Sequence, residues 1–158
     1  MPTLAGLSLS ELIDLVRNTA ADSEQWRQHV RFDPVSRYFH LLRSDDVVDI
    51  WLLTWLPGQA TDLHDHGGSA AAIQVVQGNL HERHADHSGR LDDHSLALGS
   101  THWLAPDAVH DVYNVDAPPA VSIHAYSPPL RSMTFYQPVA GGLEPLRTVP
   151  TREPEVSL

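Results

Sequence analysis

The central part of the chain, residues 37–137, is a succession of short strand-like segments, with turn residues recurring roughly every ten residues. Val47–Leu56 is the clearest of them. Trp51, Leu53 and Trp55 share one face, and the alternate face is also apolar, so both faces are expected to be buried. Further strands are predicted at 70–76, 80–83, 91–98, 102–104, 109–115, 120–126 and 133–136. Strands at this spacing predict an all-β sandwich or barrel.

Helical periodicity is confined to the N-terminal part. Apolar residues recur at helical spacing from Ser8 to Ala20, and Ser8 with Glu11 forms a capping-box signature. A second short helix is predicted near Asp22–Val30. We therefore expect one domain with N-terminal helices at 1–33, a β-barrel at 37–137 and an extended or frayed tail at 138–158.

Three histidines on the predicted barrel point to a metal site. His64 and His66 flank Asp65, and strand alternation would place both imidazoles on one face. His110, at the start of another predicted strand, can supply a third nitrogen. His-x-His alone is a weak signal in a chain with eleven histidines, but the added glycine, proline and His110 spacing makes it specific.

This layout resembles the two sequence motifs of cupins, which form jelly-roll barrels. Gly58 precedes the histidine pair, Gly78 closes that segment, and the second motif runs from Gly99 through Pro106 and His110 to Asn114. Ala70 and Ala71 stand where cupins usually carry a glutamate ligand. Three neutral imidazoles leave a divalent ion with its full charge and open positions, which favours an anionic ligand such as a thiolate together with dioxygen.

A second motif narrows the resemblance to the cysteine dioxygenase family. Ser122, His124 and Tyr126 share a strand face and are followed by Ser127-Pro128-Pro129, which is similar to that family's Ser-x-His-x-Tyr strand. The resemblance implies Fe(II) at the histidines and a Ser122–His124–Tyr126 hydrogen-bonded relay. It also implies a small thiol and O2 as substrates, a sulfinic acid product, and a cis Ser127–Pro128 peptide.

The chain departs from this family at two places. Animal members crosslink the tyrosine to a cysteine, but Ala71 occupies that position and the chain has no cysteine, as in bacterial members. The family's carboxylate-binding arginine, in a Tyr-x-Arg segment, aligns with His40 beside Tyr38. Arg37 and Arg43 are the alternative substrate-binding residues, and we expect at most one of them to point inward. Cysteine and 3-mercaptopropionate both stay open as substrates.

The remaining histidines have simpler interpretations. His81, His84 and His87, with Asp86, are expected at a solvated hairpin tip, because steps of three alternate faces on a strand. His29, His94 and His102 are expected as surface or packing residues, and Trp103 as a wall of the cavity. Two alternative functions stay open: a cupin oxygenase with a non-thiol substrate, and a non-catalytic cupin that binds a metal or small ligand.

Composition excludes several classes of function. The formal net charge of −10, with ten arginines and no lysine, argues against nucleic acid or an anionic membrane as a partner and against Schiff-base chemistry. Absence of cysteine excludes disulfides and thiolate metal sites. The first residues lack the pattern of a secretory signal. We expect a cytoplasmic monomer.

Overall fold

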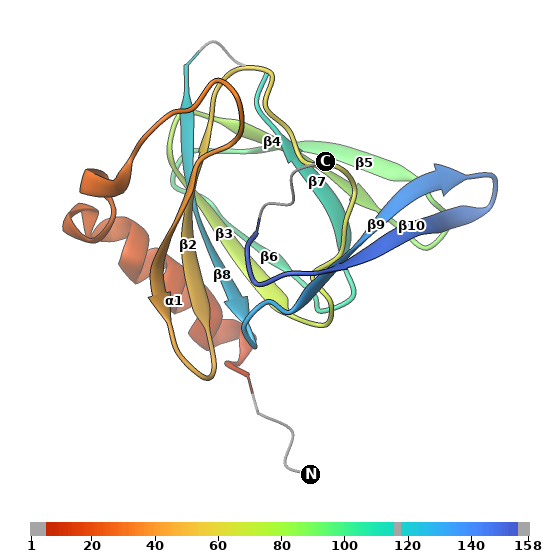
Figure 1. Ribbon diagram of the computed structural model, residues 1–158, viewed down its shortest axis with the longest axis horizontal. Coiled ribbons are helices and arrows are strands. Elements are labelled where there is room, and N and C mark those ends of the chain that lie inside the picture. The colour runs from red at the N-terminus through yellow and green to blue at the C-terminus, as the bar shows by residue number, and fades with distance from the viewer. Residues whose placement is uncertain (1–5, 116–117, 155–158) are drawn as a thin grey trace.

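The computed structural model describes residues 6–115 and 118–154. The one α-helix in these two ranges, α1 (Leu9–Ala21), packs on the outside of the larger sheet (Figure 1). The capping box is confirmed, since Glu11 N donates to Ser8 Oγ and Ser8 N donates to Glu11 Oε1. The second predicted helix forms instead as two single 3-10 turns, η1 (Ser23–Gln25) and η2 (Arg27–His29).

Two facing antiparallel sheets form the barrel, and a hairpin extends from it (Figure 1). The larger sheet has the order β1 (Phe39–Ser44), β2 (Asp49–Trp55), β8 (Ala120–Ser127), β3 (Ala70–Gln77) and β6 (Thr101–Leu104). The smaller has the order β5 (Leu91–Leu96), β4 (Leu80–Ala85) and β7 (Val109–Tyr113). The hairpin pairs β9 (Ser132–Val139) with β10 (Gly142–Pro150). The predicted all-β jelly-roll class is confirmed.

Strand β2 is buried along its whole length, as its two apolar faces predict. Trp51, Leu53 and Trp55 belong to the core inside the barrel. Ile50 and Leu52 belong to a second core, between the sheet and α1. Because residues directly opposite one another on neighbouring strands share a face, each strand residue can be assigned to the barrel interior or to the helix side.

Part of the segment 138–158, expected to be an extended or frayed tail, is instead a paired strand, because Gly142–Pro150 pairs with β9. Residues 155–158 lie outside the described residues. Prolines suggested a tail, since proline cannot donate to a β ladder. Pro145, however, lies at the register shift between Pro145 and Arg147, where the regular ladder is already interrupted. Arg147 also packs over the ring of Phe135, with 5.0 Å between its Cζ atom and the ring centroid.

The connection between β2 and β3, for which the sequence predicts a ligand-bearing strand, is irregular. Only isolated bridges occur in it, Ala60 with Tyr113 and His64 with both His110 and Phe135. The Ser127–Pro128 peptide, which follows β8, is cis. Within residues 6–115 and 118–154, no helix is long and apolar enough to cross a membrane.

Candidate metal centre

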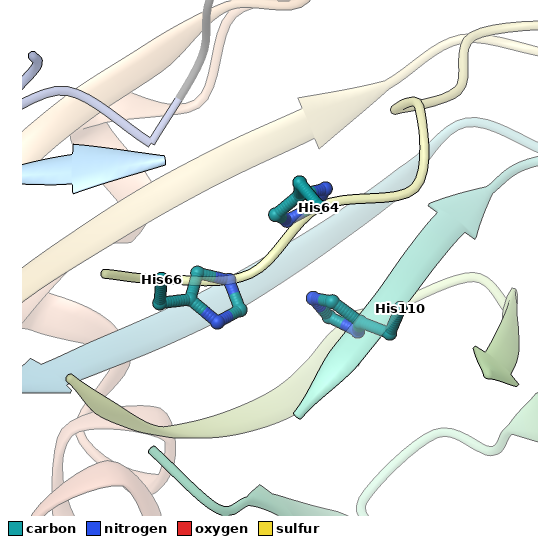
Figure 2. A group of neighbouring side chains, drawn as sticks. All are labelled: His64, His66 and His110. Atoms are coloured by element: carbon teal, nitrogen blue, oxygen red, sulfur yellow. The ribbon is translucent and has the colours of Figure 1, made fainter. Parts of the chain in front are cut away.

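His64, His66 and His110 meet inside the barrel (Figure 2). Their ring centroids form a nearly equilateral triangle with sides of 4.9 Å (64–66), 4.8 Å (64–110) and 5.0 Å (66–110). One ring nitrogen from each lies within 4.8 Å of the other two, and all three residues are buried. The sequence-predicted ligands are therefore brought together.

Hydrogen bonds fix the backbone around His64 and His66, which lie in the irregular segment between β2 and β3. His64 and His110 exchange a pair of backbone bonds, N to O 2.9 Å in one direction and 3.0 Å in the other. Between the two histidines, Asp65 turns away and ties the segment to β9. Its Oδ1 accepts from Thr134 N at 3.0 Å, and its Oδ2 accepts from the Tyr136 hydroxyl at 2.8 Å. His64 and His66 therefore point to one side and Asp65 to the other, although the segment is not a regular strand.

Gly67 provides the bend that ends this segment. Its φ is +58°, a left-handed conformation that glycine adopts without strain. A Cβ atom there would lie 2.3 Å from Ser132 Oγ and 2.6 Å from Ser132 O. The close approach that requires glycine is therefore to Ser132, at the start of β9, rather than to the metal position.

The ring nitrogens of the triad are prepared for a cation. His64 Nδ1 lies 2.6 Å from Asp62 O, and His110 Nδ1 lies 2.8 Å from Glu82 Oε2. Each Nδ1 therefore carries a proton, and the lone pair of each Nε2 is available to a metal ion. Burial, with a smaller contribution from His110, lowers the pKa of His64 to about 3. Burial also holds the pKa of His66 well below its usual value. These imidazoles are neutral at neutral pH, a donor set that suits a divalent transition metal.

Glu82 is a residue of the site that the sequence did not reveal. It is 1% exposed, and its carboxylate contacts His84 and His94 as well as His110. Burial by itself raises the pKa of Glu82, but the hydrogen bonds from His110 and His84 outweigh it and the pKa is lowered, so the group is ionised. Alternation from the buried Leu80 would have pointed Glu82 inward.

Ser122, His124 and Tyr126 line the interior face of β8. Ser122 Oγ lies 2.7 Å from His124 Nε2, and His124 Nδ1 lies 3.4 Å from the Tyr126 hydroxyl. The Tyr126 ring is 5.2 Å from that of His66, between centroids. Trp55 extends this row, because its Nε1 donates to Ser122 Oγ at 2.9 Å. The aromatic spacing on β2 flagged Trp55 as a core residue but gave no sign of this polar contact.

Two of the four predicted substrate-binding residues lie on the wrong face for that role. His40 pairs with Leu52, and both Leu52 and Tyr38 belong to the helix-side core. The His40 ring stacks on that of His29 in η2, with 4.0 Å between centroids. His40 and Tyr38 therefore point away from the three histidines.

Arg37 and Arg43 separate in the structure. A register shift between Leu41 and Arg43 turns Arg43 to the surface, where it pairs with Asp45 at 2.9 Å. Arg37 lies 5.6 Å above the Trp55 ring, measured from its Cζ atom to the ring centroid. Its charge also contributes to lowering the pKa of His64, after burial and His110. Of the two arginines predicted to bind substrate, Arg37 is thus the one that lies toward the histidine triad.

Comparison with known proteins agrees with this arrangement. A family model described as cysteine dioxygenase type I matches residues 5–138. The chain belongs to this family. Cysteine dioxygenase type 1 of Danio rerio is 26% identical over 143 residues, which cover 83% of this chain and 71% of that protein. The human cysteine dioxygenase type 1 is 23% identical over 133 residues, which cover 78% of this chain and 66% of that protein.

Solved structures show the same fold at low identity. A Thermus thermophilus protein superposes with a TM-score of 0.58 and 24% identity, covering 65% of this chain and 92% of that one. A Klebsiella pneumoniae protein with a double-stranded beta-helix domain gives a TM-score of 0.57 and 16% identity, covering 77% and 93%. These likenesses support the barrel fold of this cysteine dioxygenase family member.

The crosslink position can also be located in this cysteine dioxygenase relative. Ala71 of β3 pairs directly with Tyr126 of β8. A side chain at position 71 is therefore next to the tyrosine, but alanine offers no sulfur and the chain contains no cysteine. Tyr126 is held by packing and hydrogen bonds alone.

The other histidines differ partly from expectation. His87 is exposed beside the Ser88-Gly89 turn, as predicted for a hairpin tip. His84 instead contacts Glu82, and so does His94 across the β4–β5 pair. Trp103 does not line the barrel interior as expected, because it pairs with Ala72 of the helix-side core and is 42% exposed.

Proposed function

We propose that this protein is an Fe(II)-dependent thiol dioxygenase that converts a small thiol to its sulfinic acid. The observation that carries the proposal is a triad of buried imidazoles beside Tyr126, in a member of the cysteine dioxygenase family. No carboxylate joins the triad as a ligand among the described residues. Three neutral donors favour an anionic substrate at the metal.

The reaction balances without a further reductant. R–SH and O2 give R–SO2H, so two S–O bonds form, the O–O bond breaks, and sulfur gives up the four electrons that the oxygen atoms gain. When bound, Fe(II) supplies open coordination positions and the one-electron chemistry that couples thiol and dioxygen. His64, His66 and His110 would hold it.

Arg37 is the residue we assign to the far end of the substrate. It is the cation of the predicted set on the interior side, and its guanidinium packs on Trp55, which belongs to the interior core. A guanidinium binds a carboxylate through two parallel hydrogen bonds. The assignment favours thiols that carry a carboxylate, such as cysteine and 3-mercaptopropionate, over thiols without one.

The row Trp55, Ser122, His124 and Tyr126 positions the phenol. The indole N–H is always a hydrogen-bond donor, so Ser122 Oγ accepts from Trp55. The Ser122 hydroxyl can then donate its own hydrogen bond to His124 Nε2. His124 is neutral, because burial lowers its pKa to about 3, and its Nδ1 then donates toward Tyr126. In this arrangement the phenol proton can point toward the substrate.

Oxygen uptake tests the proposal. The metal-free protein is loaded with Fe(II) under anaerobic conditions, and oxygen consumption is then measured with cysteine, 3-mercaptopropionate and cysteamine. We expect uptake with at least one carboxylate-bearing thiol, and a Tyr126→Phe variant that loses turnover while it still binds Fe(II). If no thiol drives uptake beyond that of a His110→Ala variant, the proposed function is wrong.

A further inference from the structure

A second group of polar side chains faces the barrel interior beside the histidine triad. Glu82 of β4 pairs with Val112, which belongs to the interior core, so Glu82 points inward. His94 of β5 pairs with Glu82, and His84 of β4 pairs with His110. Both histidines therefore share this interior face. A carboxylate and two imidazoles in the wall of a largely apolar barrel call for a chemical explanation.

The three side chains converge on one point. Glu82 Oε1 lies 3.0 Å from His84 Nε2 and 2.8 Å from His94 Nε2, and all three atoms lie within 4.8 Å of one another. Glu82 is 1% exposed, whereas the side chains of His84 and His94 are 35% and 41% exposed. The group thus combines a buried charge with two imidazoles that solvent can reach.

We propose that Glu82, His84 and His94 form a second binding site, for a divalent transition-metal ion such as Zn²⁺. Two imidazoles and one carboxylate are a common donor set for such ions. Ligands at about 2.1 Å from a tetrahedral ion lie roughly 3.4 Å apart, so the two rings need to open by only a few tenths of an ångström. Their partial exposure allows that movement.

His102 gives an independent indication of a ligand here. It lies on β6 and pairs with Ile73 of the interior core, so it faces this group from the opposite sheet. Its ring centroid is 5.9 Å from that of His94. His102 Nε2 is buried, and it has no hydrogen-bond partner among the described residues. A buried ring nitrogen without a partner is costly unless an ion, or a water held by one, satisfies it.

Glu82 would connect the two metal positions. Its Oε2 accepts the bond from His110 Nδ1, while its Oε1 is the atom directed at His84 and His94. One carboxylate therefore orients a ligand of the first site and belongs to the second. The second site needs neither a thiol nor oxygen, so its test is separate from that of the proposed function.

Metal stoichiometry provides the test. The metal-free full-length protein is equilibrated with Zn²⁺, and bound zinc is measured after removal of the excess. We expect two equivalents for the wild type, one each for His84→Ala and His94→Ala, and one for His66→Ala, which retains the second site. His87→Ala is the matched control, because it removes an exposed histidine from the end of the same hairpin, and it should keep two equivalents.

One equivalent in the wild type that His84→Ala and His94→Ala keep and His66→Ala loses, or two equivalents in both His84→Ala and His94→Ala, would overturn the proposal. In either case His84 and His94 would only be hydrogen-bond donors to Glu82. Circular dichroism checks the folding of each variant. If a variant does not fold, ¹⁵N spectra of histidine rings in the wild type decide: the Nε2 resonances of His84 and His94 must shift with the second equivalent, and unchanged resonances refute the site.

Discussion

Glu82 Oε2 lies 2.8 Å from His110 Nδ1, and both side chains are almost completely buried. This contact keeps the His110 proton on Nδ1 and leaves Nε2 as the metal-binding nitrogen. Asp62 O has the same effect on His64 at 2.6 Å. Two of the three ligands are therefore oriented by fixed acceptors before any ion binds.

Glu82→Gln should weaken metal binding at the triad by about 10- to 100-fold, because it removes the charge behind His110 and preserves the shape of the side chain. The measurement is Co²⁺ affinity in a His94→Ala background, where only the triad is counted. Glu144→Gln, the same change at an exposed position on β10, is the control and should leave the affinity unchanged. Equal affinities in the two variants would show that Glu82 does not support the site.

Gly67→Ala should destabilise the protein more than Gly68→Ala does. Both residues have positive φ, at +58° and +94°, so both substitutions introduce backbone strain of about 1–3 kcal/mol. Only the Cβ atom at position 67 meets Ser132, whereas nothing lies within 4 Å of a Cβ at position 68. Urea unfolding of the metal-free variants measures the difference. A smaller loss for Gly67→Ala would contradict the contact with Ser132.

The metal-free protein should lose stability as the pH falls below about 6.5. His64 and His124 have folded-state pKa values of about 3, chiefly because they are buried, and that of His66 is also lowered. In the unfolded chain histidine titrates near 6.5, so the unfolded state takes up more protons between about 6.5 and 3. The stability from these neutral histidines is complete above that window and declines through it.

For three such groups, the decline approaches roughly 4 kcal/mol per pH unit well below pH 6.5. Urea unfolding at pH 7.5, 6 and 5 measures it, and His124→Gln should flatten the dependence, while His87→Ala should not. Stability that stays constant from pH 7.5 to 5 would show that these imidazoles are not held neutral by the fold.

Arg37→Met should raise KM for 3-mercaptopropionate or cysteine by tenfold or more, because a charge-assisted bond to a carboxylate contributes about 1.5–3 kcal/mol. Uptake with cysteamine, which has no carboxylate, should change little. Arg43→Met is the matched control, since Arg43 is exposed and pairs with Asp45. If both variants leave KM unaltered, another residue binds the far end of the substrate.

The sequence predicted the elements that have a strong local period. Strand β2 has two apolar faces, and β8 places Ser122, His124 and Tyr126 on one side, so both could be assigned from alternation alone. The histidine triad could be predicted too, because its three members belong to two recognisable motifs. In the fold, these two motifs lie next to each other.

The sequence failed where a single irregularity decides which way a side chain points. The register shift in β1 separates Arg43 from the interior, and pairing with Leu52 places His40 on the helix side, neither of which the alignment of Tyr38 could reveal. Glu82 escaped notice because two of its three partners, His94 and His110, lie on other strands. Pro145 suggested a tail, although a bulge accommodates it in β10.

Isotope labelling follows both oxygen atoms of O2 into the product. The Fe(II)-loaded protein is supplied with ¹⁸O2 and the thiol that gives the fastest oxygen uptake, and the product is analysed by mass spectrometry. An Fe(II)-dependent thiol dioxygenase gives a sulfinic acid that carries two ¹⁸O atoms, with one O2 consumed per product. A disulfide as the only product, or a sulfinic acid without both labels, would contradict the proposed function.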